Sequence, residues 1–371
     1  MAYDGADHYV LEFGGDPDFG STWTFANGTW TNVTLTVHGS PSPRAGGSMV
    51  FDPGRNETLL FGGYSFAGSG STLADTWAYR AGTWTNLSGT VGAAPPARYF
   101  AGFAYDRNDS ADVLFGGINN SSAPVDGTWE LVDGAWSNVT GNQSSSPVST
   151  QSPAFTSDVP DGDAVLFGSG TASAPFQNQT WTFSGNRWTN LTGNLTTAPP
   201  GVADAALSPD SAAGGVMLFG GYARPPGGVN LPAWLGETWV FSGGRWTDVG
   251  TGAPYPAERE LEMMADDPAD SGVVLYSGAD YVAMTVFEDT WRFASGTWTQ
   301  VGSPSMPTPR DGASMAYDST THQVILFGGS VLNDTWSYAG GTWSPLTTAS
   351  TPPRRISAAL VDDPGDGELV L

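Results

Sequence analysis

The chain has 371 residues and a formal net charge of −24, because 37 acidic residues outnumber 13 basic residues, all of them arginine. That balance disfavours phosphate backbones and anionic lipid surfaces, which bind clustered Lys and Arg, so we expect no nucleic-acid partner. No run of about 18 apolar residues suggests a membrane span, so we expect no direct membrane insertion within this segment. The absence of cysteine excludes disulfides, zinc–thiolate sites and cysteine nucleophiles. An aromatic content of 12 % argues against disorder and predicts a packed core.

The chain opens inside a sequence repeat. Its first residues, Met1 to Asp4, copy the end of the segment Ser314 to Asp318, so we expect this chain to be a fragment of a longer one. The predicted repeats form a single domain over 1–371, with approximate bounds 1–40, 41–94, 95–146, 147–198, 199–255, 256–306 and 307–351, and a partial closing repeat at 352–371.

Three aromatic anchors define the repeat. The first is an aromatic residue heading a Gly-Gly step or a close variant of it, at Phe13, Phe61, Phe115, Phe167, Phe219, Tyr276 and Phe327. The second is the Trp of a Thr-Trp pair, at Trp23, Trp77, Trp129, Trp181, Trp239, Trp291 and Trp336. The third is a Trp seven residues later, at Trp30, Trp84, Trp136, Trp188, Trp246, Trp298 and Trp343. We expect these aromatics to fill the space between neighbouring sheets.

Each repeat predicts four short strands, A to D. An Asp nine residues before the first aromatic marks an A–B turn, as in Asp52-Pro53-Gly54-Arg55-Asn56, and a second hairpin joins the two Trp residues. The spacing from the first aromatic to the first Trp varies instead, over 10, 16, 14, 14, 20, 15 and 9 residues. All this variation falls on the B–C connections, and variable loops on a constant scaffold are where binding usually resides.

The sequence therefore predicts an all-β fold, a seven-bladed propeller of four-stranded antiparallel blades. The alternative is part of a longer, eight-blade array, because residues from Arg355 onward supply another strand A, up to Val361, and the start of a strand B, Glu368 to Leu371.

The repeat resembles the kelch family, which also includes the central domain of galactose oxidase. The resemblance rests on Pro309 to Tyr317, on Val324-Ile325-Leu326-Phe327-Gly328-Gly329 and on Trp343, and it covers nearly the whole chain. It implies a propeller with a binding role. The copper cofactor of galactose oxidase needs a Cys-linked Tyr, which this cysteine-free chain cannot form, so we expect no cofactor apart from a weak possibility of Ca²⁺.

Arginines at the start of strand A are the first candidate ligand-binding residues. They stand eight residues before the turn Asp, at Arg44, Arg98, Arg259, Arg310 and Arg355. Guanidinium groups around one opening could hold carboxylate or sulfate groups. The alternative is that each arginine pairs with a carboxylate of the neighbouring blade and only staples the ring. Tyr64, Tyr222 and Trp234 in the B–C loops are further binding candidates, for a sugar or a peptide.

Catalysis finds little support in the sequence, and we assign no catalytic or metal-ligating residue. The three histidines, His8, His38 and His322, have different local settings and no metal-ligand spacing. The acidic pair Asp266-Asp267 and the acidic run from Asp362 to Asp366 could bind Ca²⁺ weakly or act in glycoside hydrolysis, but Asp is expected at these turns anyway.

Thirteen of the 15 asparagines begin an Asn-X-Ser/Thr sequon. These glycosylation candidates are Asn27, Asn32, Asn56, Asn86, Asn108, Asn119, Asn120, Asn138, Asn142, Asn178, Asn190, Asn194 and Asn333. Repeat copying explains some of them, but the density fits an exported glycoprotein. Together with the absence of disulfides and of lysine, it favours a prokaryotic or archaeal cell-surface protein.

The leading functional hypothesis is a non-catalytic extracellular binding or scaffold propeller that takes a protein or carbohydrate ligand through its B–C loop face. The alternative is a carboxylate-based glycan-acting enzyme, a hydrolase or lyase, with its site at the mouth of the channel.

Overall fold

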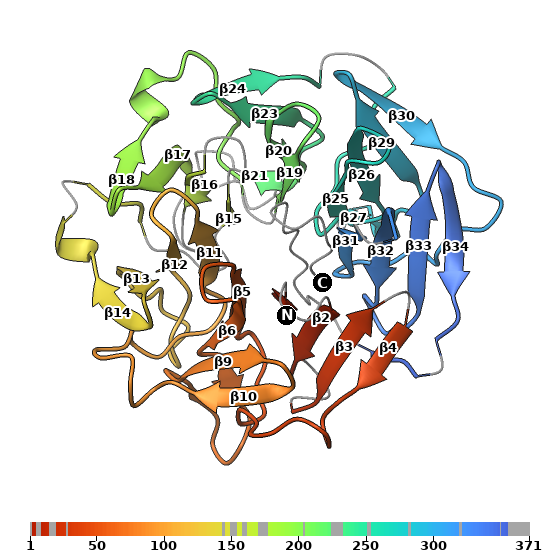
Figure 1. Cartoon of the computed structure of the whole chain (residues 1–371). Coiled ribbons are helices and arrows are strands. Elements are labelled where there is room, and N and C mark those ends of the chain that lie inside the picture. Colours follow the sequence, from red (N-terminus) through yellow and green to blue (C-terminus); the bar gives the residue numbers. More distant parts are fainter. Residues whose placement is uncertain are drawn as a thin grey trace.

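The structure is a computed structural model in which four-stranded sheets stand radially around a central opening (Figure 1). It describes residues 2–4, 9–14, 20–26, 29–142, 145–148, 154–157, 162–169, 177–202, 205–223, 233–250, 254–280, 283–318, 321–348 and 350–354. Among these residues there is no helix long and apolar enough to cross a bilayer. Helical structure is confined in this part of the chain to two short 3₁₀ turns, η1 (Thr140–Asn142) and η2 (Thr192–Asn194).

Seven antiparallel sheets of four strands are present among the described residues, and in each the strands run A to D from the centre outward. The N-terminal sheet contains β1 (Ala2–Asp4), β2 (Tyr9–Phe13), β3 (Thr22–Ala26) and β4 (Thr29–Asn32). Blade I contains β5 (Ser48–Asp52), β6 (Glu57–Phe61), β9 (Thr76–Arg80) and β10 (Thr83–Asn86). Blade II contains β11 (Gly102–Asp106), β12 (Ala111–Phe115), β13 (Thr128–Val132) and β14 (Ala135–Asn138). Blade III contains β15 (Ala154–Ser157), β16 (Ala164–Ser169), β17 (Gln177–Ser184) and β18 (Arg187–Asn190).

The remaining blades follow the same order. Blade IV contains β19 (Ala206–Asp210), β20 (Gly215–Phe219), β23 (Thr238–Ser242) and β24 (Arg245–Asp248). Blade V contains β25 (Met263–Asp267), β26 (Gly272–Tyr276), β29 (Thr290–Ala294) and β30 (Thr297–Val301). Blade VI contains β31 (Ser314–Asp318), β32 (Gln323–Phe327), β33 (Thr335–Ala339) and β34 (Thr342–Leu346). In the described part of the chain, three B–C connections carry small two-stranded pairs: β7 (Tyr64–Ser65) with β8 (Ser71–Thr72), β21 (Tyr222–Ala223) with β22 (Ala233–Trp234), and β27 (Ala279–Asp280) with β28 (Thr285–Val286).

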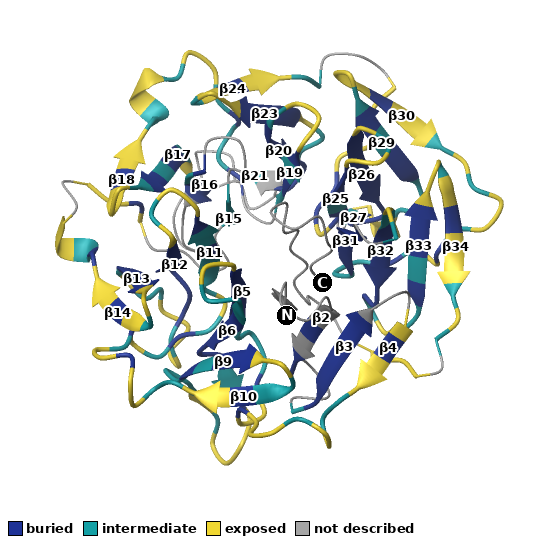
Figure 2. Ribbon diagram, viewed as in Figure 1, coloured by how far each residue is buried: buried dark blue, intermediate teal, exposed yellow. Residues whose placement is uncertain are grey.

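Burial falls from the B strands to the outer edge of each blade (Figure 2). Strand B is buried along its length in β12, β20 and β26, because sheets pack against both of its faces. Strand D buries one residue, its Trp, and exposes most of the others, as in β14 and β24. This difference in burial explains why strand B is a nearly continuous apolar run. It also explains why strand D is polar apart from a single Trp.

The aromatic anchors fill the space between neighbouring sheets, as predicted. The aromatic at the end of strand B contacts the strand-D Trp of the next sheet, with ring centroids 5.5 Å apart for Phe61 and Trp136 and 5.2 Å apart for Phe115 and Trp188. Equivalent pairs are Phe13–Trp84, Phe167–Trp246, Phe219–Trp298, Tyr276–Trp343 and Phe327–Trp30. These packed pairs bury large apolar area at every junction between sheets.

A hydrogen bond also crosses each junction and explains why Thr precedes the first Trp. The indole Nε1–H of the strand-D Trp donates to the hydroxyl of the Thr that directly precedes the strand-C Trp in the preceding sheet. The pairs are Trp84–Thr22, Trp136–Thr76, Trp188–Thr128, Trp246–Thr180, Trp298–Thr238, Trp343–Thr290 and Trp30–Thr335. A buried indole N–H needs an acceptor, and this Thr supplies it.

The prediction of seven blades is corrected to six complete blades and an N-terminal sheet of lesser extent. Every strand of blades I to VI has at least four residues, whereas the innermost strand of the N-terminal sheet, β1, has three. That sheet still lies between blades VI and I, because Trp30 bonds to Thr335 and Trp84 bonds to Thr22. The aromatic anchors lie on strands B to D, so they could not report how complete strand A is. The alternative of an eighth repeat falls on residues 355–371, outside the described residues.

Candidate functional site

The two edges of the ring differ in which side chains they expose. Since neighbouring strands are antiparallel, the B–C and D–A connections lie at one edge, here called the upper edge, and the A–B and C–D turns lie at the other, the lower edge. Of the ten large hydrophobic side chains that are exposed in the described part of the chain, nine belong to the B–C and D–A connections: Leu35, Phe66, Phe100, Val148, Tyr255, Leu261, Met284, Val286 and Val331. The tenth, Val132, is the last residue of β13 and lies next to a C–D turn at the lower edge.

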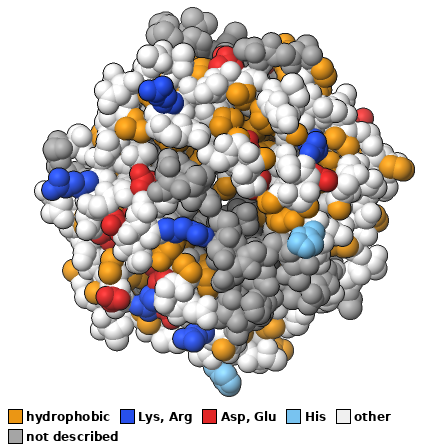
Figure 3. Space-filling view, turned by 45° about the horizontal axis from the view of Figure 1, so that its top comes forward, with side chains coloured by type: hydrophobic (Ala, Val, Ile, Leu, Met, Phe, Trp, Pro, Cys, Tyr) orange, Lys and Arg blue, Asp and Glu red, His pale blue; other side chains and the backbone are white. Residues whose placement is uncertain are grey.

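Figure 3 shows one face of the molecule, on which hydrophobic side chains gather around the centre and basic side chains are scattered singly. Exposed apolar groups are costly when they are contiguous and mark contact surfaces in many proteins. The upper edge is therefore the first candidate for a binding surface.

The predicted arginines at the start of strand A lie at this edge but are not open to solvent. Arg44, Arg98, Arg259 and Arg310 are 0 to 1 % exposed. In each, Nη1 donates to the carbonyl oxygen 18 residues later, at the end of strand B, and Nε donates to the carbonyl two residues earlier. The fifth, Arg355, lies outside the described residues.

Three of these arginines also hold a carboxylate that ends the B–C connection of their own blade. Arg44 pairs with Asp75, Arg259 with Asp289 and Arg310 with Asp334, each through two hydrogen bonds of 2.6 to 2.9 Å. The same carboxylate accepts the Nε1–H of the Trp two residues later at 2.7 Å, in Trp77, Trp291 and Trp336. The ion pairs thus lie within one blade, and the expectation of pairing with a neighbouring blade is wrong in this respect.

The charge of the arginine overcomes the effect of burial on these acids. Burial alone would raise the pKa of Asp289, but the hydrogen bonds and charge of Arg259 and the indole of Trp291 lower it below its ordinary value. The same opposition lowers the pKa of Asp75 and Asp334. Each arginine therefore fastens both ends of a variable loop to its blade, so the loops sit on a rigid base.

The residue after the arginine extends this fastening into a small cap. Tyr99 pairs with Ile118, just past the Gly-Gly step, and Ile118 pairs with Pro124. Blade I repeats the pattern through Ala45, Tyr64 and Thr72, and blade V through Glu260, Ala279 and Val286. These three-segment caps form the upper surface of blades I, II and V.

Blade II departs from the other arginine-bearing blades. Gly127 separates its acid, Asp126, from the Thr-Trp pair, and Arg98 reaches only main-chain carbonyls, including those of Val125 and Asp126 at 3.5 and 3.4 Å. The buried Nε1–H of Trp129 has no hydrogen-bond partner. Burial lowers the pKa of Arg98 to about 10, and the charge of Asp126 offsets this only in part. The Asp126 side chain is exposed at the upper edge.

The position two residues after the arginine has a left-handed backbone in four blades. Gly46 and Gly312 occupy it with φ of 62° and 58°, as expected for glycine. In the other two blades it holds Phe100 and Leu261, with φ of 54° and 52° and exposed fractions of 40 % and 37 %. A bulky residue there costs about 1–3 kcal/mol, and such strain clusters at functional sites. Sequence reasoning missed both, although the glycines in register were a signal.

The other predicted binding residues are placed as follows. Tyr64 lies at the upper edge, paired with Ala45 and Thr72, and its ring contacts Phe66 and Tyr99. Tyr222 and Trp234 pair with each other in the two-stranded β21–β22, and their side chains lie outside the described part of the structure.

The Asp residues that recur in the A–B turns of the repeats lie at the lower edge. Five of these acids have described side chains, which are 0 to 6 % exposed: Asp52, Asp106, Asp210, Asp267 and Asp318. Each accepts at least one hydrogen bond from a main-chain N–H of its turn. This is the structural role that the sequence suggested for Asp at these turns.

Several lower-edge carboxyl groups have pKa values far from ordinary. Burial, with the charge of Asp109, raises the pKa of Asp106 to about 7, and burial raises that of Glu130 to about 7 as well. Asp112 is fully buried, neither of its oxygens has a hydrogen-bond partner, and burial with the nearby Asp52 charge raises its pKa well above 3.8. At pH 7, Asp106 and Glu130 are therefore about half protonated.

The predicted Ca²⁺ candidates gain no geometric support. Burial raises the pKa of Asp266 and of Asp267 to about 6, which disfavours the ionised form that would bind a cation. Within the described ranges, no group of three or more His, Asp or Glu is placed to hold a metal ion. The run Asp362 to Asp366 falls outside those ranges.

Four sequons have a structural use at the end of strand D. The Asn side-chain oxygen accepts the N–H two residues later, and the hydroxyl of that Ser or Thr accepts the N–H of the Thr that begins strand C. The sets are Asn32–Thr34–Thr22, Asn86–Ser88–Thr76, Asn138–Thr140–Thr128 and Asn190–Thr192–Thr180. The fold therefore accounts for the repetition of these sequons, while glycosylation stays a prediction. Asn27 lies outside the described residues.

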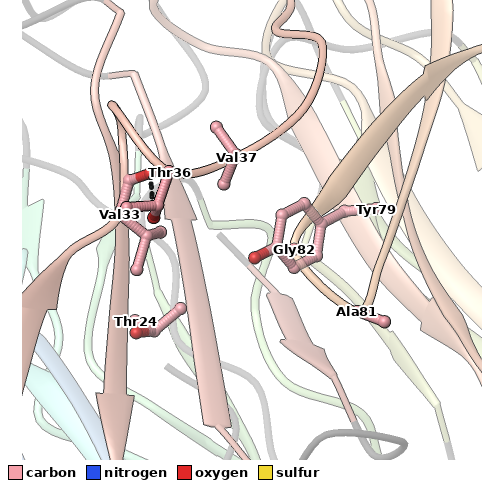
Figure 4. Close-up of a pocket in the computed structure, with 7 residues that line it drawn as sticks. All are labelled: Thr24, Val33, Thr36, Val37, Tyr79, Ala81 and Gly82. Carbon is pink, nitrogen blue, oxygen red and sulfur yellow. Dashed lines mark hydrogen bonds between the residues drawn. The ribbon is translucent and has the colours of Figure 1, made fainter.

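A crevice of about 360 Å³ lies between the N-terminal sheet and blade I (Figure 4). Its lining is apolar or carries hydroxyl groups: Thr24, Val33, Thr36, Val37, Tyr79, Ala81 and Gly82. Thr36 donates its hydroxyl to the Val33 carbonyl, so one of its few polar groups is already engaged. The crevice holds no charged or nucleophilic constellation and offers no chemistry.

Comparison with known proteins supports the propeller assignment over part of the chain. A stretch of 123 residues is 31 % identical to the F-box/kelch-repeat protein At1g51550 of Arabidopsis thaliana, covering 31 % of this chain and 25 % of the plant protein. No protein-family model matches the sequence. The four-stranded radial sheets and this partial similarity together support a kelch-type propeller.

Proposed function

We propose that this propeller is a non-catalytic binding scaffold that holds a protein ligand on its upper edge. The observation that carries the proposal is the concentration of exposed apolar side chains there, nine of ten in the described residues. The buried arginines add rigidity, because loops already fastened at both ends lose less conformational entropy when they bind. The kelch-type similarity supports a protein-interaction scaffold.

The same proposal includes the location of the protein, which we place outside the cell. Thirteen sequons in one chain support an extracellular, cell-surface glycoprotein. Intact-mass measurement of native material tests it: glycan mass on the chain is expected, and a mass equal to that of the bare polypeptide would overturn this part.

A carbohydrate ligand or a glycan-acting enzyme is the second candidate, and one residue favours it. Glu262, at the start of strand A in blade V, is buried, its Oε2 has no partner, and burial raises its pKa to about 8. A carboxyl group that stays protonated near neutral pH can act as a general acid. If Glu262→Gln abolishes a hydrolytic activity found in a glycan screen, the enzyme replaces the scaffold.

Binding to immobilised peptide and glycan arrays tests the proposal. Met284→Ser and Val331→Ser change exposed apolar residues of the upper edge, and Val132→Ser is the matched control at the lower edge. We expect peptide binding that the upper-edge variants weaken and the control leaves unchanged. The opposite pattern, or no binding to peptides, would contradict it.

A further inference from the structure

Four aromatic side chains form a continuous ridge across the upper edge of blades I and II. Ring centroids are 5.0 Å apart for Phe66 and Tyr64, 5.5 Å for Tyr64 and Tyr99, and 5.0 Å for Tyr99 and Phe100. The two ends of this aromatic ridge, Phe66 and Phe100, are 55 % and 40 % exposed. Tyr64 and Tyr99, between them, are partly buried, so the ridge exposes most of its aromatic surface at its two ends.

The structure around the ridge keeps its rings in place at a cost in backbone strain. Phe100 has φ of 54°, a conformation that glycine adopts without strain in the same position of two other blades. A Cβ on Gly46 would come within 2.9 Å of the Phe100 ring, and one on Gly70 would collide with the Tyr64 hydroxyl. Phe100 is strained and partly exposed, and Gly46 and Gly70 leave room for the rings of the ridge. This combination indicates that the ridge has a role other than stabilising the fold.

The tilt of the rings distinguishes between classes of ligand. Successive ring planes along the ridge meet at 73°, 53° and 46°, so no two of them form a flat platform. A sugar stacks face to face on an open ring. Tilted rings instead leave notches that fit protruding side chains, and aromatic residues are enriched at the centres of protein interfaces.

Charge narrows the class further. Asp126 lies at the end of the blade II cap whose first segment is Tyr99, and its side chain is exposed. In the three other arginine-bearing blades the corresponding acid is bound to Arg and Trp, whereas Arg98 approaches only the main chain here. The chain as a whole carries a charge of −24, which attracts cationic partners at long range.

We propose that the aromatic ridge and the Asp126 carboxylate form a docking site for a polypeptide segment that combines apolar side chains with a Lys or Arg. The apolar side chains enter the notches of the ridge, and the cationic group pairs with Asp126. This inference rests on the proposed function, and it assigns that function to one place on the upper edge and to one class of partner.

The test measures binding of the intact chain to three sets of short synthetic peptides by calorimetry. One set carries Lys or Arg among Leu, Phe and Pro, one replaces the basic residues with Glu, and one with Ser. Neutral oligosaccharides form a fourth arm. We expect binding to the basic set, weakened by added salt, and weaker or no binding to the other arms.

Variants locate the site. Phe100→Gly removes the ring at a position where glycine is unstrained, so we expect a Tm equal to or above that of the parent and a loss of affinity of about tenfold or more. Asp126→Asn is expected to lower affinity severalfold and to reduce its salt dependence. Leu35→Ser, an exposed residue of the upper edge outside the ridge, is the control and is expected to change neither.

The outcomes separate the two proposals. If peptides bind but Phe100→Gly has no effect while Met284→Ser does, the scaffold stands and the ridge is wrong. Equal binding of acidic and basic peptides overturns the role of Asp126. Oligosaccharide binding that is lost in Phe100→Gly assigns the ridge to sugars and overturns the polypeptide partner. If no arm binds, both proposals fall.

Discussion

The upper and lower edges of this propeller are made from the same repeats, yet they use buried charge in opposite ways. At the lower edge, buried acids such as Asp52 and Asp106 accept hydrogen bonds from turns of constant length. At the upper edge, buried arginines fasten connections of variable length. The lower edge exposes one large hydrophobic side chain in the described residues and the upper edge exposes nine.

This contrast shows how a repeat can separate stability from binding. Because the arginine fixes both ends of each loop from within the blade, the loop length and its outward side chains are free to vary without loosening the sheet. The lower edge has no such freedom, since its turn acids require a particular turn. The upper edge buries charged side chains and exposes large apolar ones, which reverses the usual distribution. Among the described residues, the lower edge does not combine these two features.

The largest expected effect comes from removing an upper-edge staple. Arg259→Leu leaves the Asp289 carboxylate without its ion pair and the Ser277 carbonyl without a donor. We expect a loss of about 3 kcal/mol in the free energy of unfolding, measured by urea denaturation. Adding Asp289→Asn is expected to recover part of it.

Blade II supplies the matched control for this prediction. Arg98 has no bidentate carboxylate, so Arg98→Leu is expected to cost less than Arg259→Leu. Equal losses in the two variants would show that the carboxylates do not contribute to the upper edge.

The lower edge predicts a dependence of stability on pH. The pKa of Asp106 is about 7 in the folded chain and 3.8 ordinarily, so the folded state binds more protons between these values. Its stabilising contribution is complete below about pH 4 and is lost as the pH rises toward 7. We therefore expect the midpoint of urea unfolding to fall between about pH 4 and pH 7 and to level off above that range.

Asp106→Asn keeps the hydrogen bonds to the turn and removes the ionisation. It is expected to be about 1–2 kcal/mol more stable than the parent at about pH 8 and to flatten the pH dependence. A variant with the parent's slope would assign the effect to other groups, such as Asp112 or Glu130.

The smallest expected effect is a gain. Leu261→Gly relieves a left-handed backbone at φ 52°, where Gly46 and Gly312 stand in register. We expect the free energy of unfolding to be unchanged or to rise by up to about 1 kcal/mol, with a Tm that is unchanged or slightly higher. The gain is small because lost packing and the greater chain entropy of glycine oppose the relief of strain. A clear loss of stability would show that Leu261 serves the fold and not a ligand.

The sequence predicted the features that repeat without change. The Trp anchors lie on strands C and D, the aromatic of strand B packs on the next sheet, and the Asp of each of the five described A–B turns accepts a main-chain hydrogen bond. These succeed because hydrophobic spacing and turn chemistry are local. The blade count did not follow, since the anchors say nothing about how much of strand A is present.

The candidate site was predicted less well, for a physical reason. The partner of each arginine is 24 to 31 residues away, although an Asp directly before Thr-Trp in those blades was visible beforehand. The strain at Phe100 and Leu261 is a property of the backbone, and its one signal in the sequence was the glycine that two other repeats carry in the same position. Asp126 stands one residue further from the Thr-Trp pair than the acids of the other blades, because Gly127 lies between them, and this offset separates it from its arginine.

The most direct test of the account is hydrogen exchange of the intact chain with and without a saturating basic–apolar peptide. We expect added protection at the upper edge of blades I and II, over residues 63–72, 98–101 and 117–126. The lower-edge turns at 52–57 and 106–111 should exchange as before. Protection confined to the lower edge, or spread equally over both, would contradict the assignment of binding to the upper edge.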